Sequence, residues 1–209
     1  KIGLPAAGMA VLRVASLAVF TLALKMANDS NAIGGMRVGF AIESIMFMPA
    51  FGLSMAASAL VGQSLGMKKP DRAETLAWTA AHQAALVTAL FVVPIFLAAP
   101  AIANSLIVGK PEMAAEATSL IRWLCGTEIF FAYAMVMIGA MQGAGDTTRP
   151  LWITIVALWM LRVPLTFLFA LGLGWGSTGA WIAMSGSQAI QGILAIIAFR
   201  QGAWKLKQV

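Results

Sequence analysis

Four ionisable side chains interrupt long apolar stretches of this sequence: Arg13, Glu43, Glu128 and Arg162. Each lies inside a run of about 20 or more mainly apolar residues, which is the length that crosses the hydrocarbon core of a bilayer. A charge at that depth costs about 2.5–3.5 kcal/mol on insertion scales, so it normally faces a partner or a wet cavity. These four residues are therefore the first candidates for binding or transport chemistry.

Two interpretations of these charges remain open from the residues alone. In the structural interpretation, Glu43 and Glu128 pair permanently with Arg13 and Arg162 and fix the register of their helices. In the functional interpretation, at least one carboxylate faces water and binds Na⁺ or H⁺ alternately with a cationic solute. The two arginines suit pairing better than proton exchange, because a guanidinium stays charged.

Other side chains offer further roles near these charges. His82 would suit a proton relay, since histidine titrates near neutral pH, although a hydrogen-bonded packing role is the simpler interpretation. Flexible thioethers and aromatic rings could line a pocket for aromatic cations, or else pack in the core or against lipid. The candidates for pocket lining are Met46, Phe47, Phe131 and Met135.

Several kinds of site are excluded. His82 has no second histidine and Cys125 is the single cysteine, which excludes a histidine metal site, a cysteine zinc cluster and an internal disulfide. The sequence also lacks a glycine-rich phosphate loop, a His-Glu-x-x-His pair and a nucleophile with a nearby base. We therefore expect no enzyme activity and no cofactor other than a coupling ion.

The composition indicates a membrane protein. The 209 residues are 60% hydrophobic and only 11% charged, whereas a soluble domain carries roughly 25% charged residues. The apolar surface must therefore contact a lipid bilayer. The net charge of +6 does not indicate nucleic-acid binding, because the basic residues stand singly or in pairs between apolar runs, as membrane-topology signals do.

Charges and turn-forming residues divide the chain into six predicted transmembrane helices that form one all-α, polytopic bundle over residues 1–209. The predicted spans are residues 4–26, 34–65, 73–104, 112–142, 150–171 and 178–200. Helix kinks, which are either packing features or hinges, are expected at Pro49, Pro94, Pro100 and Pro164. Small residues at four-residue spacing predict close helix contacts at Ser58, Gly62, Gly66, Gly139 and Gly143.

The distribution of basic residues predicts the orientation. One face would carry Lys1, Lys68, Lys69, Arg72, Arg149, Arg200, Lys205 and Lys207. The opposite face would carry Lys25 and Lys110, with Arg37 and Arg122 near helix ends. The positive-inside tendency then places both ends of this segment in the cytoplasm of a cell whose inner (plasma) membrane holds the protein. Since the chain opens at Lys1 without an initiator methionine, we expect a segment of a longer protein.

Four motifs carry a family resemblance. They are "MPAFGLSMAASALVGQSLG" at residues 48–66, "GAMQGAGDTTRP" at 139–150, "WMLRVPLTF" at 159–167 and "GSTGAW" at 176–181. Together and in this order they resemble the MATE (multidrug and toxic compound extrusion) transporters of the MOP superfamily, in the bacterial type. The resemblance implies a parent of twelve helices in two lobes, of which this chain is the C-terminal lobe and lacks the N-terminal one. It also implies multidrug efflux by antiport of small organic cations against Na⁺ or H⁺.

The resemblance bears on individual sites as well. "IESIMFMP" at residues 42–49 fits the family pattern and supports Glu43 as a carboxylate of the lobe. Glu128 lies about one turn from the acidic position of some members, and the first helix has no carboxylate before Asp29, where some members have one. Two alternatives are a lipid-linked oligosaccharide flippase of the same superfamily, favoured if Arg13 and Arg162 face a larger cationic cavity, and a non-transport membrane enzyme. Self-association of the six helices as a complete protein is a third.

Overall fold

The computed structural model describes residues 3–27 and 29–206, and this part of the chain is all-α, as predicted. The helices are α1 (Gly3–Met26), α2 (Ser30–Gly66), α3 (Pro70–Leu106), α4 (Pro111–Gly143), α5 (Thr148–Thr154), α6 (Val163–Phe167) and α7 (Gly176–Arg200). Two π-helical segments, η1 (Ile155–Arg162) and η2 (Leu168–Gly172), join α5 and α6 into one continuous rod, and a 3-10 turn, η3 (Ala203–Leu206), follows α7. Six helices are long and apolar enough to cross a membrane, which confirms the predicted number of spans.

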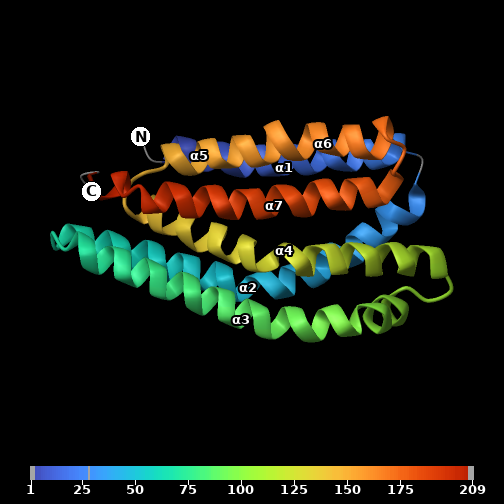
Figure 1. The fold of residues 1–209 in the computed structure, drawn as a ribbon, viewed down its shortest axis with the longest axis horizontal. Coiled ribbons are helices and arrows are strands. Elements are labelled where there is room, and N and C mark those ends of the chain that lie inside the picture. The colour runs from blue at the N-terminus through green and yellow to red at the C-terminus, as the bar shows by residue number, and fades with distance from the viewer. Residues whose placement is uncertain (1–2, 28, 207–209) are drawn as a thin grey trace.

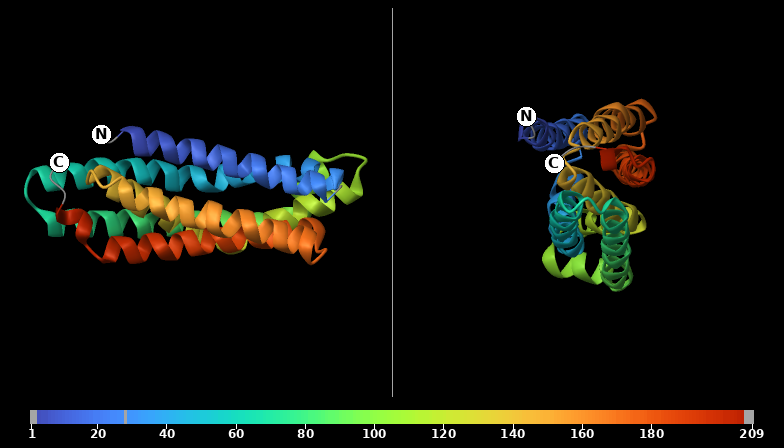
Figure 2. Two further views of the ribbon diagram at one scale, coloured as in Figure 1. Left: turned by 90° about the horizontal axis from the view of Figure 1, so that it is seen from above. Right: turned by 90° about the vertical axis from the view of Figure 1, so that its left-hand side faces the viewer.

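The helices run roughly along one long axis (Figure 1). Seen from the end, α2, α3 and α4 form one group, and α1, the α5–η2 rod and α7 form the other (Figure 2). The most extensive contacts join α4 to α2, α3 and α7, so α4 lies at the centre of the bundle. Half or more of the most apolar window of α4 and of α7 is buried, against 17% for α3, and α3 is therefore the most exposed of the long helices.

Two helices begin three or four residues earlier than predicted, in each case for a local reason. α2 starts at Ser30 because the Asp29 side chain accepts a 2.8 Å hydrogen bond from the Ala32 amide, which caps the helix. α3 starts at Pro70, since proline suits the first turn of a helix, where its missing N–H has no intrahelical acceptor. Polar residues that were expected to separate helices therefore start them.

The fifth span differs from a plain helix. Pro164 lies in the first turn of α6 and cannot donate a backbone hydrogen bond, and the π-helical segment η1 immediately precedes α6. π-helical turns are rare in proteins and often accompany functional positions. Arg162 is the last residue of η1, so its side chain leaves the rod at this irregular stretch.

Close packing of α2 on α4 confirms most of the predicted small-residue contacts. A Cβ atom added at Gly143 would collide with the Ser58 backbone, and one at Gly62 would lie 2.9 Å from the Gly143 carbonyl oxygen. Gly139 faces Ser54, whose hydroxyl donates a 2.7 Å hydrogen bond to a carbonyl of α4. Gly66, in contrast, has open space around it and makes no such contact.

The basic residues gather largely at one end of the bundle, here called the basic end: residues 67–69, 144–147 and 201–206. α1 begins at this end, and η3 reaches it from α7 (Figure 1). Lys205 pairs there with Glu74 and, at 3.9 Å, with Asp71, while Arg149 pairs with Asp146. Lys1 and Lys207 lie outside the described residues, and the cytoplasmic location of this end stays a prediction.

Candidate functional site

A cavity of about 230 Å³ lies inside the bundle and contains most of the side chains singled out from the sequence. It is lined by Arg13, Leu17, Phe40, Glu43, Phe47, Phe131, Met135, Leu158, Arg162, Met184, Gln188 and Gln191. These residues come from α1, α2, α4, η1 and α7, so both groups of helices contribute to it. We call this space the central cavity.

Glu43 is held in the central cavity by an amide. The Nε2 atom of Gln188 on α7 donates a 2.7 Å hydrogen bond to Oε1 of Glu43 on α2. The Oε1 atom of Gln188 accepts a hydrogen bond of 3.4 Å from the Thr127 hydroxyl on α4. The amide thus has its oxygen towards α4 and its N–H donors towards the carboxylate, which stabilises an ionised Glu43.

The two arginines of the cavity do not pair with a carboxylate. Arg162 donates from Nε to the Ser187 hydroxyl at 2.8 Å. Every ion pair found in the described part of the chain lies at the basic end, so neither arginine is joined to Glu43 or Glu128. The permanent pairing of the structural interpretation is therefore absent, and the cavity exposes two guanidinium groups and one carboxylate.

Glu128 lies on α4, next to Thr127 and outside the residues that line the central cavity. It is only 1% exposed, and neither carboxylate oxygen has a hydrogen-bond partner among residues 3–27 and 29–206. An isolated ionised carboxylate in such surroundings is very costly, so this group requires a bound proton or a cation. A site for a coupling ion needs a group of this kind, which binds a proton or a cation.

Two of the candidate residues do not reach the central cavity. Met46 is fully buried and its sulfur lies 3.8 Å from the Cys125 sulfur, so the expected lining role is not met here. His82 is exposed on α3, where a ring nitrogen lies 2.6 Å from the Trp78 carbonyl oxygen and the ring packs edge-on against Tyr133. These contacts match the packing role of His82, and the proton relay stays a prediction.

The aromatic and thioether candidates behave differently. Phe47 and Phe131 both line the central cavity and contact each other edge to face, with ring centroids 6.5 Å apart. Met135 lines the same space and also a second cavity of about 230 Å³. Arg13 belongs to both cavities as well, so the two spaces meet at Arg13 and Met135 and continue along the bundle to Gln142 near the basic end.

Sequence reasoning missed the glutamines of α7. Gln188 and Gln191 lie almost one turn apart, and both are only 2% exposed. Their sequence positions could have indicated a site, because both amides lie in a span without charged residues and a buried polar side chain inside a membrane needs a partner. Ser187, which binds Arg162, gives a weaker signal, since serine is common wherever membrane helices pack closely.

Comparison with known proteins agrees with this architecture. The MatE family model matches residues 5–168. The chain is 28% identical over 183 residues to a probable multidrug resistance protein NorM of Thermotoga maritima, an alignment that covers 86% of this chain and 39% of the relative. The chain thus spans less than half the length of the curated relatives that it matches.

Solved structures share the fold at low sequence identity. The MATE transporter ClbM, solved in complex with Rb⁺, superposes with a TM-score of 0.90 at 18% identity and covers 99% of this chain and 48% of its own. A MOP superfamily transporter from Pyrococcus furiosus superposes with a TM-score of 0.84 at 17% identity, over 93% of this chain and 42% of that transporter. Its binding pocket is described as having reverse polarity, which suggests a different function for that transporter. With six membrane-spanning helices and a family match over most of its length, the chain is a multi-pass membrane protein that belongs to the MATE family.

Proposed function

We propose that the chain forms one lobe of a cation-coupled antiporter that exports organic cations across the plasma membrane by alternating access. The observation that carries this proposal is Glu128, a buried carboxyl group without a hydrogen-bond partner in the described part of the chain. It lies beside Thr127, which joins it to the hydrogen-bonded pair of Gln188 and Glu43. The lobe therefore holds two carboxyl groups with different requirements for a cation.

In this mechanism the coupling ion, Na⁺ or H⁺, neutralises the carboxyl group of Glu128 and the organic cation competes for Glu43. The rings of Phe47 and Phe131 line the same cavity, and aromatic rings attract cations over their faces. Each ligand biases the transporter between inward- and outward-open forms only by its difference in affinity for the two forms. Coupling energies of this kind are typically about 1–3 kcal/mol, or roughly 5–150-fold in affinity.

The test is efflux of ethidium from proteoliposomes that contain the complete transporter chain. Na⁺ and H⁺ gradients are imposed separately, at equal membrane potential. Ethidium movement that depends on one gradient supports antiport and identifies the ion. Correctly folded protein that moves no ethidium under either gradient would contradict the proposal.

A second candidate is export of anionic, lipid-linked substrates, such as lipid-linked oligosaccharides. Arg13 and Arg162 both line the central cavity and form no ion pair within the described residues, and this is the observation that favours it. A described reversal of pocket polarity in the Pyrococcus furiosus relative gives the idea a precedent in fold neighbours. At about 230 Å³ the central cavity is below the roughly 300–1,000 Å³ of pockets that hold drug-sized ligands, so this lobe alone encloses neither a drug nor an oligosaccharide, and volume does not separate the two candidates.

Substitution of the arginines separates the two candidates. Arg13→Gln and Arg162→Gln should leave ethidium efflux within a few-fold of the parent if the transported species is a cation. If the substrate is an anionic lipid, the same variants should lose movement of a fluorescent lipid-linked glycan between leaflets. A loss of glycan movement combined with no ethidium efflux would replace the first candidate by the second.

A further inference from the structure

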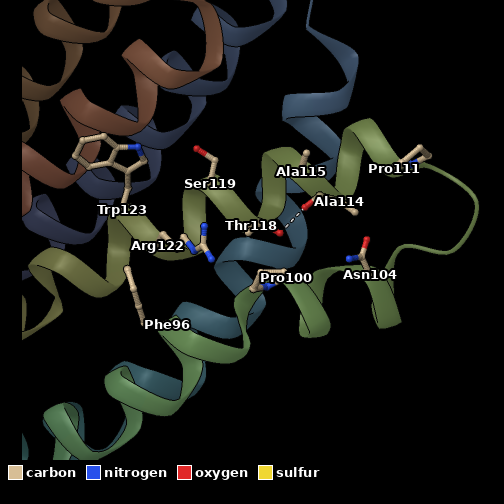
Figure 3. Close-up of a pocket in the computed structure, with 10 residues that line it drawn as sticks. All are labelled: Phe96, Pro100, Asn104, Pro111, Ala114, Ala115, Thr118, Ser119, Arg122 and Trp123. Carbon is tan, nitrogen blue, oxygen red and sulfur yellow. Dashed lines mark hydrogen bonds between the residues drawn. The ribbon is translucent and has the colours of Figure 1, made fainter.

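A groove separate from the central cavity lies between α3 and α4. It has a volume of about 700 Å³, and the residues that line it (Figure 3) lie near the α3–α4 connection, at the end of the bundle opposite the basic end (Figure 1). On α3 it is bounded by Phe96, Pro100 and Asn104, which recur at four-residue spacing and so share one helix face. Pro94 and Pro100 lie inside α3 here, where proline tends to bend a helix, and much of the facing surface of α4 carries small side chains, which leaves room for a groove.

Arg122 is the charged side chain of this groove. It points from α4 towards α3, where its guanidinium carbon lies 5.6 Å from the centroid of the Phe96 ring (Figure 3). It has no ion-pair partner within the described residues, and no carboxylate lines the groove. Stacking on a ring leaves the N–H donors at the guanidinium edge free for an anion.

The depth of Arg122 in the bundle fits a lipid headgroup. Arg122 lies roughly 30 Å along α4 from Gly143 at the basic end, given a rise of about 1.5 Å per residue. The hydrocarbon core of a bilayer is about 30 Å thick, so a membrane that begins near Gly143 reaches its other headgroup layer near Arg122. Aromatic side chains gather at this level in membrane proteins, and Phe96 and Trp123 are 43% and 41% exposed.

On the helix-end side of Arg122 the groove carries polar side chains among small apolar ones, and large apolar side chains lie towards the bilayer centre. Ser119 lies one turn from Arg122 on α4, Asn104 lies two turns beyond Phe96 on α3, and both line the groove. Further along α3, Val93 and Leu97 are 59% and 73% exposed and extend the apolar surface. A ligand that matches this order has an anionic group, a hydroxyl-bearing headgroup and acyl chains.

The geometry points to a binding site for an anionic phospholipid at the α3–α4 groove, in the leaflet away from the basic end. Arg122 binds the phosphodiester, Ser119 and Asn104 contact the headgroup hydroxyls, and the acyl chains lie along Phe96 and Trp123. A zwitterionic lipid suits the groove less well, because no carboxylate lines it to bind a choline or ammonium group.

The site is tested on the complete, purified transporter chain, with phosphatidylglycerol, phosphatidylcholine and inorganic phosphate as separate probes and native mass spectrometry as the readout of bound lipid. We expect phosphatidylglycerol to bind, phosphatidylcholine to bind more weakly, and inorganic phosphate to leave the melting temperature unchanged. Arg122→Gln should weaken phosphatidylglycerol binding by about tenfold or more, since a hydrogen bond to a charged group is lost. Arg37→Gln is the matched control: Arg37 is exposed on α2, where its side chain does not line the groove.

Ala115→Trp provides a second variant that keeps Arg122 and fills the groove from an exposed position of α4. It should weaken phosphatidylglycerol binding as strongly as Arg122→Gln does, while the lipid-free melting temperature stays close to that of the parent. Equal loss in Arg37→Gln and Arg122→Gln, unchanged binding to Ala115→Trp, or equal binding of the two lipids would each overturn the proposal.

Discussion

Gln188 donates a hydrogen bond of 2.7 Å to the carboxylate of Glu43 across the interface of α7 and α2. The preceding residue of α7, Ser187, accepts a hydrogen bond of 2.8 Å from Arg162. The adjacent residues Ser187 and Gln188 of α7 therefore bind opposite charges of the central cavity: Ser187 binds Arg162, and Gln188 binds Glu43. The carboxylate and the guanidinium stay available to ligands because each is bound by a neutral side chain rather than by the other.

The first prediction concerns this amide. Gln188→Leu should destabilise the protein by about 1–3 kcal/mol, because it leaves the part-buried carboxylate of Glu43 without its donor. Gln191→Leu is the control, since the Nε2 atom of Gln191 has no hydrogen-bond partner in the described structure and its loss should be nearly neutral. Thermal unfolding of both variants in nanodiscs measures the difference.

A double-mutant cycle tells whether Glu43 is the relevant partner. In a Glu43→Gln background the effect of Gln188→Leu should shrink, with an interaction energy of about 0.5–3 kcal/mol. Additive effects of the two substitutions would show that the hydrogen bond carries no stability of its own.

The second prediction concerns the contact of α2 with α4. Gly143→Ala should lower stability by about 1–3 kcal/mol, because its new methyl group meets the backbone of Ser58 and the helices must separate. Gly52→Ala, on an open face of α2, should raise stability by up to about 1 kcal/mol through helix propensity. Thermal unfolding that gave the two variants the same sign of change would contradict the close approach.

The third prediction compares two side chains of η3. Trp204 is fully buried, stacks on Phe199 at 4.7 Å and donates to the Phe199 carbonyl oxygen, so Trp204→Ala should cost about 3–5 kcal/mol. Lys205→Ala removes the part-exposed ion pairs with Glu74 and Asp71, and such pairs contribute at most about 1 kcal/mol. Chemical denaturation, or protease sensitivity of the basic end, should rank the variants in this order. Equal losses would mean that the ion pairs, and not the ring, fix η3 in place.

The number of spans was predictable because hydropathy acts over about 20 residues and tolerates local irregularity. Helix starts were less predictable, since Asp29 and Pro70 belong to polar stretches that look like loops until their capping roles are known. The π-helical segments around Arg162 escaped detection for a related reason. Their backbone pattern depends on how the rod packs beside α1 and α7, and not on local residue preferences alone.

The candidate site was predictable in its charged residues but not in their partners. Arg13, Glu43 and Arg162 were found because charges inside apolar spans are conspicuous, and all three meet in one cavity. The sequence could not tell that Gln188 binds Glu43, because the two residues lie 145 positions apart and meet only through helix packing. For Met46 the prediction of a lining role was wrong: a methionine suits a pocket lining, but at this position its side chain packs in the buried core.

The central claim is that Glu43 and Glu128 couple ion entry to export, and carboxylate-to-glutamine variants of the complete chain test it most directly. Ethidium efflux from proteoliposomes is measured under the gradient that drives the parent, for Glu43→Gln, Glu128→Gln, the double variant and the control Glu112→Gln, a substitution at an exposed helix start. We predict that the double variant inserts and folds but loses gradient-driven efflux. Each single variant should lose gradient-driven efflux by roughly 5–150-fold, the range of a typical coupling energy. The control Glu112→Gln should transport as the parent does. Parent-level efflux by the double variant would contradict the account.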